Sequence, residues 1–218
     1  MEERHSMATE AQKLLAEYRR GKAALDARVV ENDQWYRLRH WQRMRPSGNP
    51  GDPEPASAWL LNCLLNKHAD AMDNYPEPVV LPREEGDRAD ATVLSAVLPV
   101  ILEQNGFEQT YSDMWWQKLK SGAGILGVFW NPSKQGGQGD VDVRRVDILN
   151  LFWEPGVTDI QDSRNVFHVE LRDNEDLLAR YPQLEGKLGQ GADRPQVYVY
   201  DDAIDTSKKS AMVDWYYK

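Results

Sequence analysis

The sequence predicts an α+β fold in which N-terminal helices precede a mostly antiparallel β region that contains one short helix. Two observations carry this prediction. Apolar residues recur at helical spacing up to about residue 120, and strand-type runs dominate after it. The two kinds of segment do not alternate along the chain, as they would if helices connected the strands of a parallel sheet.

The first helix is expected from Thr9 to about Val30. Thr9 is an N-cap candidate because a glutamine follows it at capping-box spacing, and Ser6 is an alternative start one turn earlier. A second helix is expected over residues 33–44. The loop after it, residues 45–55, contains four prolines and two glycines.

The middle of the chain predicts three further helices, over residues 56–74, 90–104 and 107–120. An extended proline-rich segment (75–83) and a charged turn (83–90) separate the first two of them. Asn105-Gly106 is a strong helix stop. A kink is allowed at Pro99.

The second half predicts strands joined by turns. Strands are expected over residues 124–130, 140–146, 166–171, 196–202 and 211–218, with an extended segment over 147–156 and a short helix over 174–180. The last two strands could form a hairpin. We divide the chain into a helical N-terminal arm (1–75) and an α+β domain (76–218). Because Lys218 lies within an aromatic strand-like run, we expect the second domain to be truncated.

Composition narrows the class of protein. The net charge of −9 disfavours a protein that coats DNA non-specifically, because such proteins are usually basic. No apolar run is long enough to span a membrane, and the N-terminus lacks a signal peptide, so we expect the protein to act in a cytosol. The single cysteine, Cys63, is expected to be a buried, inert thiol. Eight tryptophans and nine tyrosines favour extensive subunit contacts.

The stretch SGAGILGVFW (121–130) contains a formal match to the dinucleotide-binding pattern G-x-G-x-x-G. That pattern binds phosphate when a strand precedes the glycines and a helix follows them. Here a predicted helix precedes them and a strand follows, so the dipole at the helix C-terminus would repel phosphate. We therefore interpret Gly122 as a left-handed helix stop, and Gly124 and Gly127 as sites of close backbone approach or a bulge.

The stretch WYRLRHWQRMR (35–45) is both basic and aromatic. Such a composition suits single-stranded nucleic acid, but it also suits a protein interface, and we favour the interface. The interface residues expected here and at the next helix are Trp35, Arg37, Arg39, Trp41, Arg43 and Trp59. Trp130 and Trp153 could belong to a second interface, although Trp130 is better explained as core because its strand is otherwise apolar.

No catalytic, cofactor-binding or metal-ligating residue is assigned. The acidic clusters are interpreted as solvated turns; they are Glu84, Glu85 and Asp87, then Asp159 and Asp162, then Asp201, Asp202 and Asp205. None of the four histidines has ligand spacing, and His68 is expected to be a half-buried, hydrogen-bonded residue. A hydrolase that uses dispersed carboxylates is a third hypothesis, after an assembly protein and a nucleic-acid-binding adaptor.

The order of segments resembles the N-terminal part of tailed-phage portal proteins. The resemblance lies in DQWYRLRHWQRMRP, in LLNCLLNKHADAMDNYPEPVVLPR and in LKSGAGILGVFWNP, followed by GDVDVRRVDILNLFWEPG and DSRNVFHVELRDNEDLLARYP. It covers roughly residues 30 to 218. No single motif is diagnostic, and the succession of motifs makes the case. The resemblance implies that residues 76–218 belong to the wing, with the stem and clip regions after Lys218.

The resemblance also implies a function. Portal proteins form a homo-oligomeric, dodecameric ring at one capsid vertex, in the virion, after assembly in the host cytoplasm. The ring nucleates head assembly, docks the terminase, contacts capsid or scaffold and tail-connector proteins, and passes double-stranded DNA without sequence specificity. The family has no catalytic site or cofactor of its own, and it does not insert in a membrane. An acidic balance would suit a channel that does not bind DNA tightly.

Overall fold

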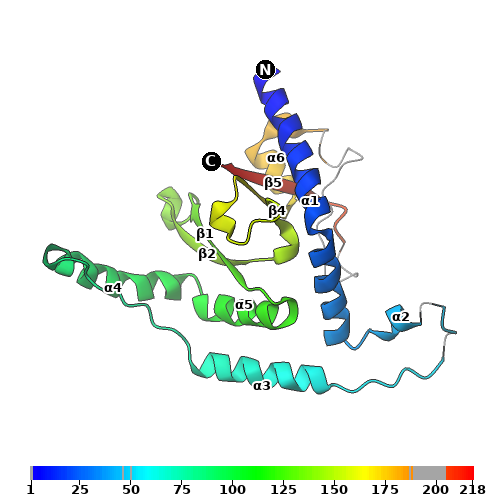
Figure 1. Ribbon diagram of the computed structural model, residues 1–218. Helices are drawn as coiled ribbons and strands as arrows, with labels where there is room; N and C mark the ends of the chain where they lie inside the picture. The colour runs from blue at the N-terminus through cyan, green and yellow to red at the C-terminus, as the bar shows by residue number, and fades with distance from the viewer. Residues whose placement is uncertain (1, 46, 50, 187, 189–204) are drawn as a thin grey trace. The chain divides into compact units, whose positions relative to one another are not determined.

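The computed structural model describes residues 2–45, 47–49, 51–186, 188 and 205–218 (Figure 1). Their contacts form two compact units, one of Met1–Ala27 with Ile148–Lys218 and one of Arg28–Asp147. The fold is α+β with antiparallel sheets, as predicted. The boundary expected between residues 75 and 76 falls inside the second unit, and the division into an arm and a wing domain stays a prediction.

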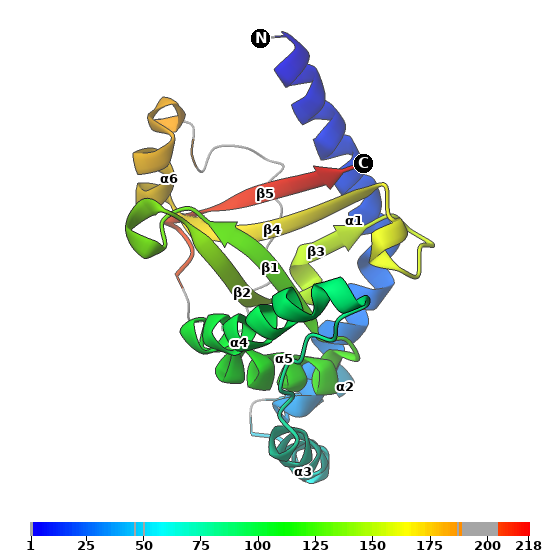
Figure 2. The same ribbon diagram turned by 90° about the vertical axis from the view of Figure 1, so that its left-hand side faces the viewer.

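The first unit is a three-stranded antiparallel sheet packed against the start of a long helix. The strand order is β3 (Leu151–Trp153), β4 (Asn165–Asp173) and β5 (Lys209–Tyr217). Figure 2 shows helix α1 (Glu2–Tyr36) lying behind these strands. The shorter helices are η3 (Ile148–Asn150), η4 (Ile160–Asp162), α6 (Asn174–Arg180) and η5 (Pro182–Leu184).

The core of the first unit forms where one face of α1 meets one face of the sheet. Leu15 and Tyr18 are three residues apart on the helix, and they pack against Phe152, Phe167 and Val169. Phe167 is completely buried, and its ring meets the Tyr18 ring edge-on at 5.7 Å between centroids. Alternate residues of a strand lie on the same face, so the alternating apolar residues Phe167 and Val169 of β4 both reach this core.

A glycine allows α1 to approach the loop after β3 closely. A β-carbon on Gly21 would lie 2.6 Å from Cγ of Pro155, so any other residue would displace the proline. The next residue, Lys22, is buried, donates a hydrogen bond to the carbonyl oxygen of Ile148, and forms a 2.8 Å ion pair with Asp26. The helix does not end at Gly21, because this close packing offsets the cost of glycine in a helix.

The second unit is a set of helices with one β-hairpin. After the end of α1, its elements are α2 (Trp41–Met44), α3 (Trp59–Asp73), η1 (Glu85–Asp87), α4 (Arg88–Gln104), α5 (Phe107–Ser121), β1 (Ile125–Asn131), η2 (Gln135–Gly137) and β2 (Asp140–Val146). Helix α5 is central, because it contacts α3, α4 and both strands of the hairpin. The strands pair in continuous register from Ile125–Val146 to Asn131–Asp140.

Helices α3 and α5 are joined by a partly buried polar contact. Nε2 of His68 lies 3.0 Å from Oγ of Ser112, and the imidazole stacks on the indole of Trp116 at 4.3 Å between centroids. The prediction of a half-buried, hydrogen-bonded His68 is confirmed.

The glycines between α5 and β1 act as the sequence predicts. Gly122 is left-handed, with φ of 87°, and its N–H donates to the carbonyl oxygen of Lys118, which ends the helix. A β-carbon on Gly124 would overlap the side chain of Met114, and one on Gly127 would overlap the ring of Phe129. Both are close approaches and not bulges, because β1 pairs without interruption.

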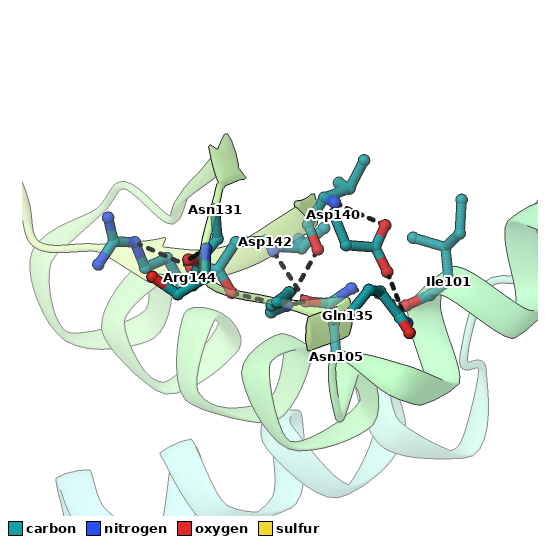
Figure 3. A network of polar contacts seen from close by, with 11 residues as sticks. Ile101, Asn105, Asn131, Gln135, Asp140, Asp142 and Arg144 are labelled. Carbon is teal, nitrogen blue, oxygen red and sulfur yellow. Dashed lines mark hydrogen bonds and ion pairs between the residues drawn. The ribbon is translucent and has the colours of Figure 1, made fainter. Parts of the chain in front are cut away.

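A polar network fixes the end of α4 against the β-hairpin (Figure 3). The Asn105 carboxamide oxygen accepts from Nζ of Lys134 at 2.6 Å and from the N–H of Val143 at 3.2 Å. Its nitrogen donates to the carbonyl oxygen of Ile101 at 2.7 Å. Lys134 also forms a 3.0 Å ion pair with Asp142. One asparagine therefore connects the last turn of α4 with the hairpin connection and with strand β2.

Several element boundaries predicted from the sequence are wrong. Helix α1 runs without a break through Thr9 and Asp33, because nothing from Glu2 to Tyr36 stops a helix and a continuous face is buried. Cys63 is exposed, since α3 turns the neighbouring Leu64 inward instead. The segment expected to be extended over 147–156 is interrupted by η3. The strand predicted over 196–202 lies outside the described residues.

Within the described residues, no helix combines the length and the apolar composition needed to cross a lipid bilayer.

Replacing Asn105 with alanine tests the network. The change removes three partly buried hydrogen bonds, one of them to a charged group, so the free energy of unfolding should fall by about 2 kcal/mol. Asn66→Ala, at an exposed position of α3, is the control and should change it by less than about 0.5 kcal/mol. Urea denaturation of the monomer measures both. Equal stability of the two variants would contradict the role given to Asn105.

The ion pair between Glu154 and Arg164 should make stability depend on pH. Hydrogen bonds from Arg164 hold the pKa of Glu154 below its ordinary value of 4.5. A lowered pKa means that the ionised carboxylate stabilises the fold above pH 4.5, and that this contribution is lost as the pH falls through the lowered pKa. The stability difference between wild type and Glu154→Gln should therefore be larger at about pH 7 than at about pH 3. The urea midpoints measure it, and an equal difference at both pH values would contradict the assignment.

Candidate subunit interface

The basic and aromatic stretch begins where α1 ends. The N–H of Arg39 donates to the carbonyl oxygen of Gln34 at 2.8 Å, and that of Leu38 donates to Trp35 at 3.2 Å. This pair of bonds is a Schellman motif. Leu38 occupies its left-handed position, with φ of 60°, where glycine is the usual residue. The helix predicted over 33–44 is therefore wrong, because the chain turns sharply after Tyr36 and resumes as the short α2.

A buried carboxylate anchors this turn to α5. Asp33 is almost fully buried, and it forms ion pairs with Arg37 at 2.8 Å and with Lys120 at 3.2 Å. The Asn32 side chain donates to the carbonyl oxygen of Lys120 at 3.1 Å, at the C-terminal end of α5. The charge of Arg37 is thus balanced within the chain, and its role is to hold the end of α1 in place.

Helix α2 is fixed in a similar way by the proline-rich loop that follows it. The indole N–H of Trp41 donates to the carbonyl oxygen of Pro55 at 2.9 Å. The guanidinium of Arg45 lies 4.5 Å from the centroid of the Trp41 ring and donates to the carbonyl oxygen of Pro53 at 2.7 Å. It is also 3.7 Å from a carboxylate oxygen of Asp52. Trp41 and Arg45 therefore order the loop and are only partly available to a partner.

Of the remaining side chains, Trp35, Arg39 and Met44 are exposed, whereas Tyr36 is half-buried and its ring centroid lies 6.2 Å from that of Trp116. The Trp35 indole stacks on the imidazole of His40 at 4.4 Å between ring centroids. The side chain of Arg43 lies outside the described residues. Trp59, the first residue of α3, is 74% exposed. We define the basic–aromatic corner as residues 35–45 together with Trp59.

A second exposed surface was not singled out from the sequence. Helix α4 exposes Val93, Leu94, Val97 and Val100, and Val93 alone is 60% exposed. Val93, Val97 and Val100 are spaced by four and three residues, so they share one face of the helix. Asp90 lies on the same face one turn earlier, and it too is exposed. The apolar spacing was visible in the sequence, but a core-facing helix has the same pattern.

Acidic residues gather where α4 begins. Glu84 and Asp87 form a reciprocal capping box around η1. Glu85, in the same turn, is exposed and makes only a surface ion pair with Arg88 at 3.5 Å. We define the acidic–apolar face as Glu84, Glu85, Asp87 and Asp90 with the exposed valines and leucine of α4.

The extended segment before η1 is held against the other side of α4. The Ser95 hydroxyl accepts from the N–H of Val80 at 2.9 Å and donates to the carbonyl oxygen of Val80 at 3.3 Å. Val80 is therefore fixed, whereas Val79 and Leu81 on either side of it are exposed. The segment adds to the apolar surface that this end of the unit presents to solvent.

The hairpin exposes a third set of apolar side chains. Leu126, Val128 and Trp130 alternate along β1, so they lie on one face, and Trp130 is 65% exposed. The interpretation of Trp130 as core is wrong. Its indole instead packs over Gly139, where a β-carbon would lie 2.5 Å from the ring.

The acidic clusters have local roles in the described part of the chain. Asp159 accepts from the N–H of Gln161 at 2.9 Å, and Asp205 accepts from the N–H of Ser207 at 2.8 Å, so both carboxylates cap turns. The hydrogen bond from the backbone N–H of Ser207 lowers the pKa of Asp205. Asp201 and Asp202 lie outside the described residues. Among the described residues, no group of three or more histidine, cysteine or acidic side chains could hold a metal ion.

Comparison with known proteins identifies the family. No curated protein sequence matches the chain significantly. The sequence profile of the phage P22-like portal protein family matches residues 69–218, which is most of the chain, and includes α4, the hairpin and the sheet of the first unit. The family is a structural one and a component of the phage virion. The chain therefore belongs to the phage P22-like portal protein family.

Proposed function

We propose that the chain is part of a subunit of the ring-shaped portal, at one vertex of the capsid, through which double-stranded DNA enters and leaves the head. One structural observation supports this proposal most. The second unit leaves large apolar side chains in solvent on α3, α4, β1 and the segment before η1. Soluble monomers rarely expose so many of them together, whereas the subunits of an assembly bury them against each other.

In this proposal the protein has the roles that a portal performs during assembly. It nucleates the head, docks the terminase, contacts capsid or scaffold and tail-connector proteins, and becomes part of the virion after assembly in the host cytoplasm. The ring is dodecameric, and ATP hydrolysis belongs to the terminase. DNA passes without sequence-specific contacts, and the net charge of −9 is consistent with a channel that does not hold DNA by phosphate contacts.

The alternative function, a nucleic-acid-binding adaptor that uses residues 35–45, is less well supported. Of the four arginines in this stretch, Arg37 is paired with Asp33 and Arg45 lies against Asp52 and Trp41. Trp41 is hydrogen-bonded to the following loop and is not free to stack on a base. The surface is better suited to a protein partner than to a phosphate backbone.

Electron microscopy of the complete gene product tests the proposed function. We expect closed rings with a central channel, with about twelve subunits by native mass spectrometry, because a head-to-tail contact that closes generates a ring. A stable monomer under assembly conditions would contradict the proposal. Salt-dependent duplex binding by that monomer, if lost in a triple Arg37→Ala, Arg39→Ala and Arg43→Ala variant, would support the adaptor instead.

A further inference from the structure

A ring of identical subunits requires two different surfaces on each subunit. In a head-to-tail contact, one patch of a subunit meets a different patch of its neighbour, so the two patches must be complementary and must lie on different sides. The second unit carries two exposed patches that satisfy both conditions, the acidic–apolar face and the basic–aromatic corner.

The two patches have opposite charge. Residues 33–52 contain four arginines and two acidic residues, Asp33 and Asp52, which pair with Arg37 and Arg45, so this segment keeps an excess of two positive charges. Residues 70–90 contain seven acidic residues and two arginines. The N-terminal helix dipole explains why acidic residues are tolerated at the start of α4. It does not explain why Val93, Val97 and Val100, on the same face of the helix, are also exposed to solvent.

The two patches also match in chemistry beyond charge. In the acidic–apolar face, branched aliphatic side chains follow the carboxylates along α4, on the same side of the helix as Asp90. The basic–aromatic corner offers Trp35, Met44 and Trp59 as apolar contacts beside Arg39. Tryptophan and arginine are the residue types that most often dominate binding energy at protein interfaces.

The two patches lie at opposite ends of the second unit. Figure 1 shows η1 and the start of α4 at one end, and α2 with the first turn of α3 at the other. In Figure 2, turned by 90°, α4 lies toward the viewer and α2 lies behind it. A contact that joins these ends between copies would therefore add copies in a row, as a head-to-tail contact does.

We propose that the acidic–apolar face of one subunit docks on the basic–aromatic corner of a second copy of the same chain. The inference rests on the proposed function, because it names the two surfaces through which the ring closes. Carboxylates of η1 and α4 meet Arg39 at the rim, and the valines of α4 cover Trp35 and Trp59 at the centre. Since the rim charges remain near solvent, assembly weakens as the salt concentration rises.

A charge-swap experiment on the complete protein tests this pairing. Glu85→Lys with Asp90→Lys places like charges against the arginines, and it should weaken each contact about tenfold or more, so that rings are lost. Arg39→Glu with Arg43→Glu should have the same effect. All four changes together restore opposite charges and should restore rings. Glu10→Lys with Glu17→Lys, at exposed positions of α1, is the control and should leave rings intact.

Crosslinking gives an independent readout that does not depend on reversed charges. In a Cys63→Ala background, Trp59→Cys with Val97→Cys should give a ladder of disulfide-linked subunits on oxidation, whereas either cysteine alone should not. Far-ultraviolet circular dichroism checks that each variant is folded.

The outcomes separate the inference from the function on which it rests. Wild-type protein that forms no rings would overturn both. Wild-type rings together with normal rings of the Glu85→Lys, Asp90→Lys variant, or no rescue by the four-fold variant, would overturn the pairing alone. Either result would assign the acidic–apolar face to a different protein, such as a capsid or motor component.

Discussion

The carboxamide of Asn105 is the contact on which the arrangement of the second unit depends. It accepts from Lys134 and Val143 of the hairpin and donates to Ile101 of α4, so the last turn of the helix cannot move without breaking partly buried hydrogen bonds. The middle of α4 is held by Ser95, whose hydroxyl bonds both backbone groups of Val80. These two attachments decide which face of α4 packs inward and which face stays in solvent.

With α4 fixed in this way, several of its apolar side chains stay exposed among the residues that the structure describes. Val93, Val97 and Val100 are exposed on α4, and Trp59 is exposed at the start of α3. The starts of α4 and α3 lie at opposite ends of the unit (Figure 1). Burying such side chains against a neighbour removes apolar area from water, at roughly 25 cal/mol for each Å². We propose that neighbouring subunits cover these side chains, which is consistent with membership of a family of structural virion proteins.

Residue type and spacing predicted most of the fold. Gly122 was recognisable as a helix stop, and alternating valines predicted the second strand of the hairpin. The end of α1 could not be predicted for two reasons. Leu38 has a left-handed backbone conformation, which a leucine in the sequence does not indicate. The buried Asp33, which anchors the end of the helix, pairs with a lysine far along the chain. The acidic–apolar face was missed because periodicity shows only that valines share a face, and not whether that face is buried. Trp130 was assigned to the core because its strand is otherwise apolar, although the strand exposes one of its two faces.

The most direct measurement is a cryo-electron microscopy reconstruction of the ring formed by the complete protein. The account predicts that Val93 and Val97 of one subunit lie within contact distance, about 4.5 Å, of Trp35 or Trp59 of the next. It also predicts that Glu85 or Asp90 lies near Arg39 of that neighbour. A ring in which this face of α4 is open to solvent, or is covered by another part of its own chain, would contradict the account.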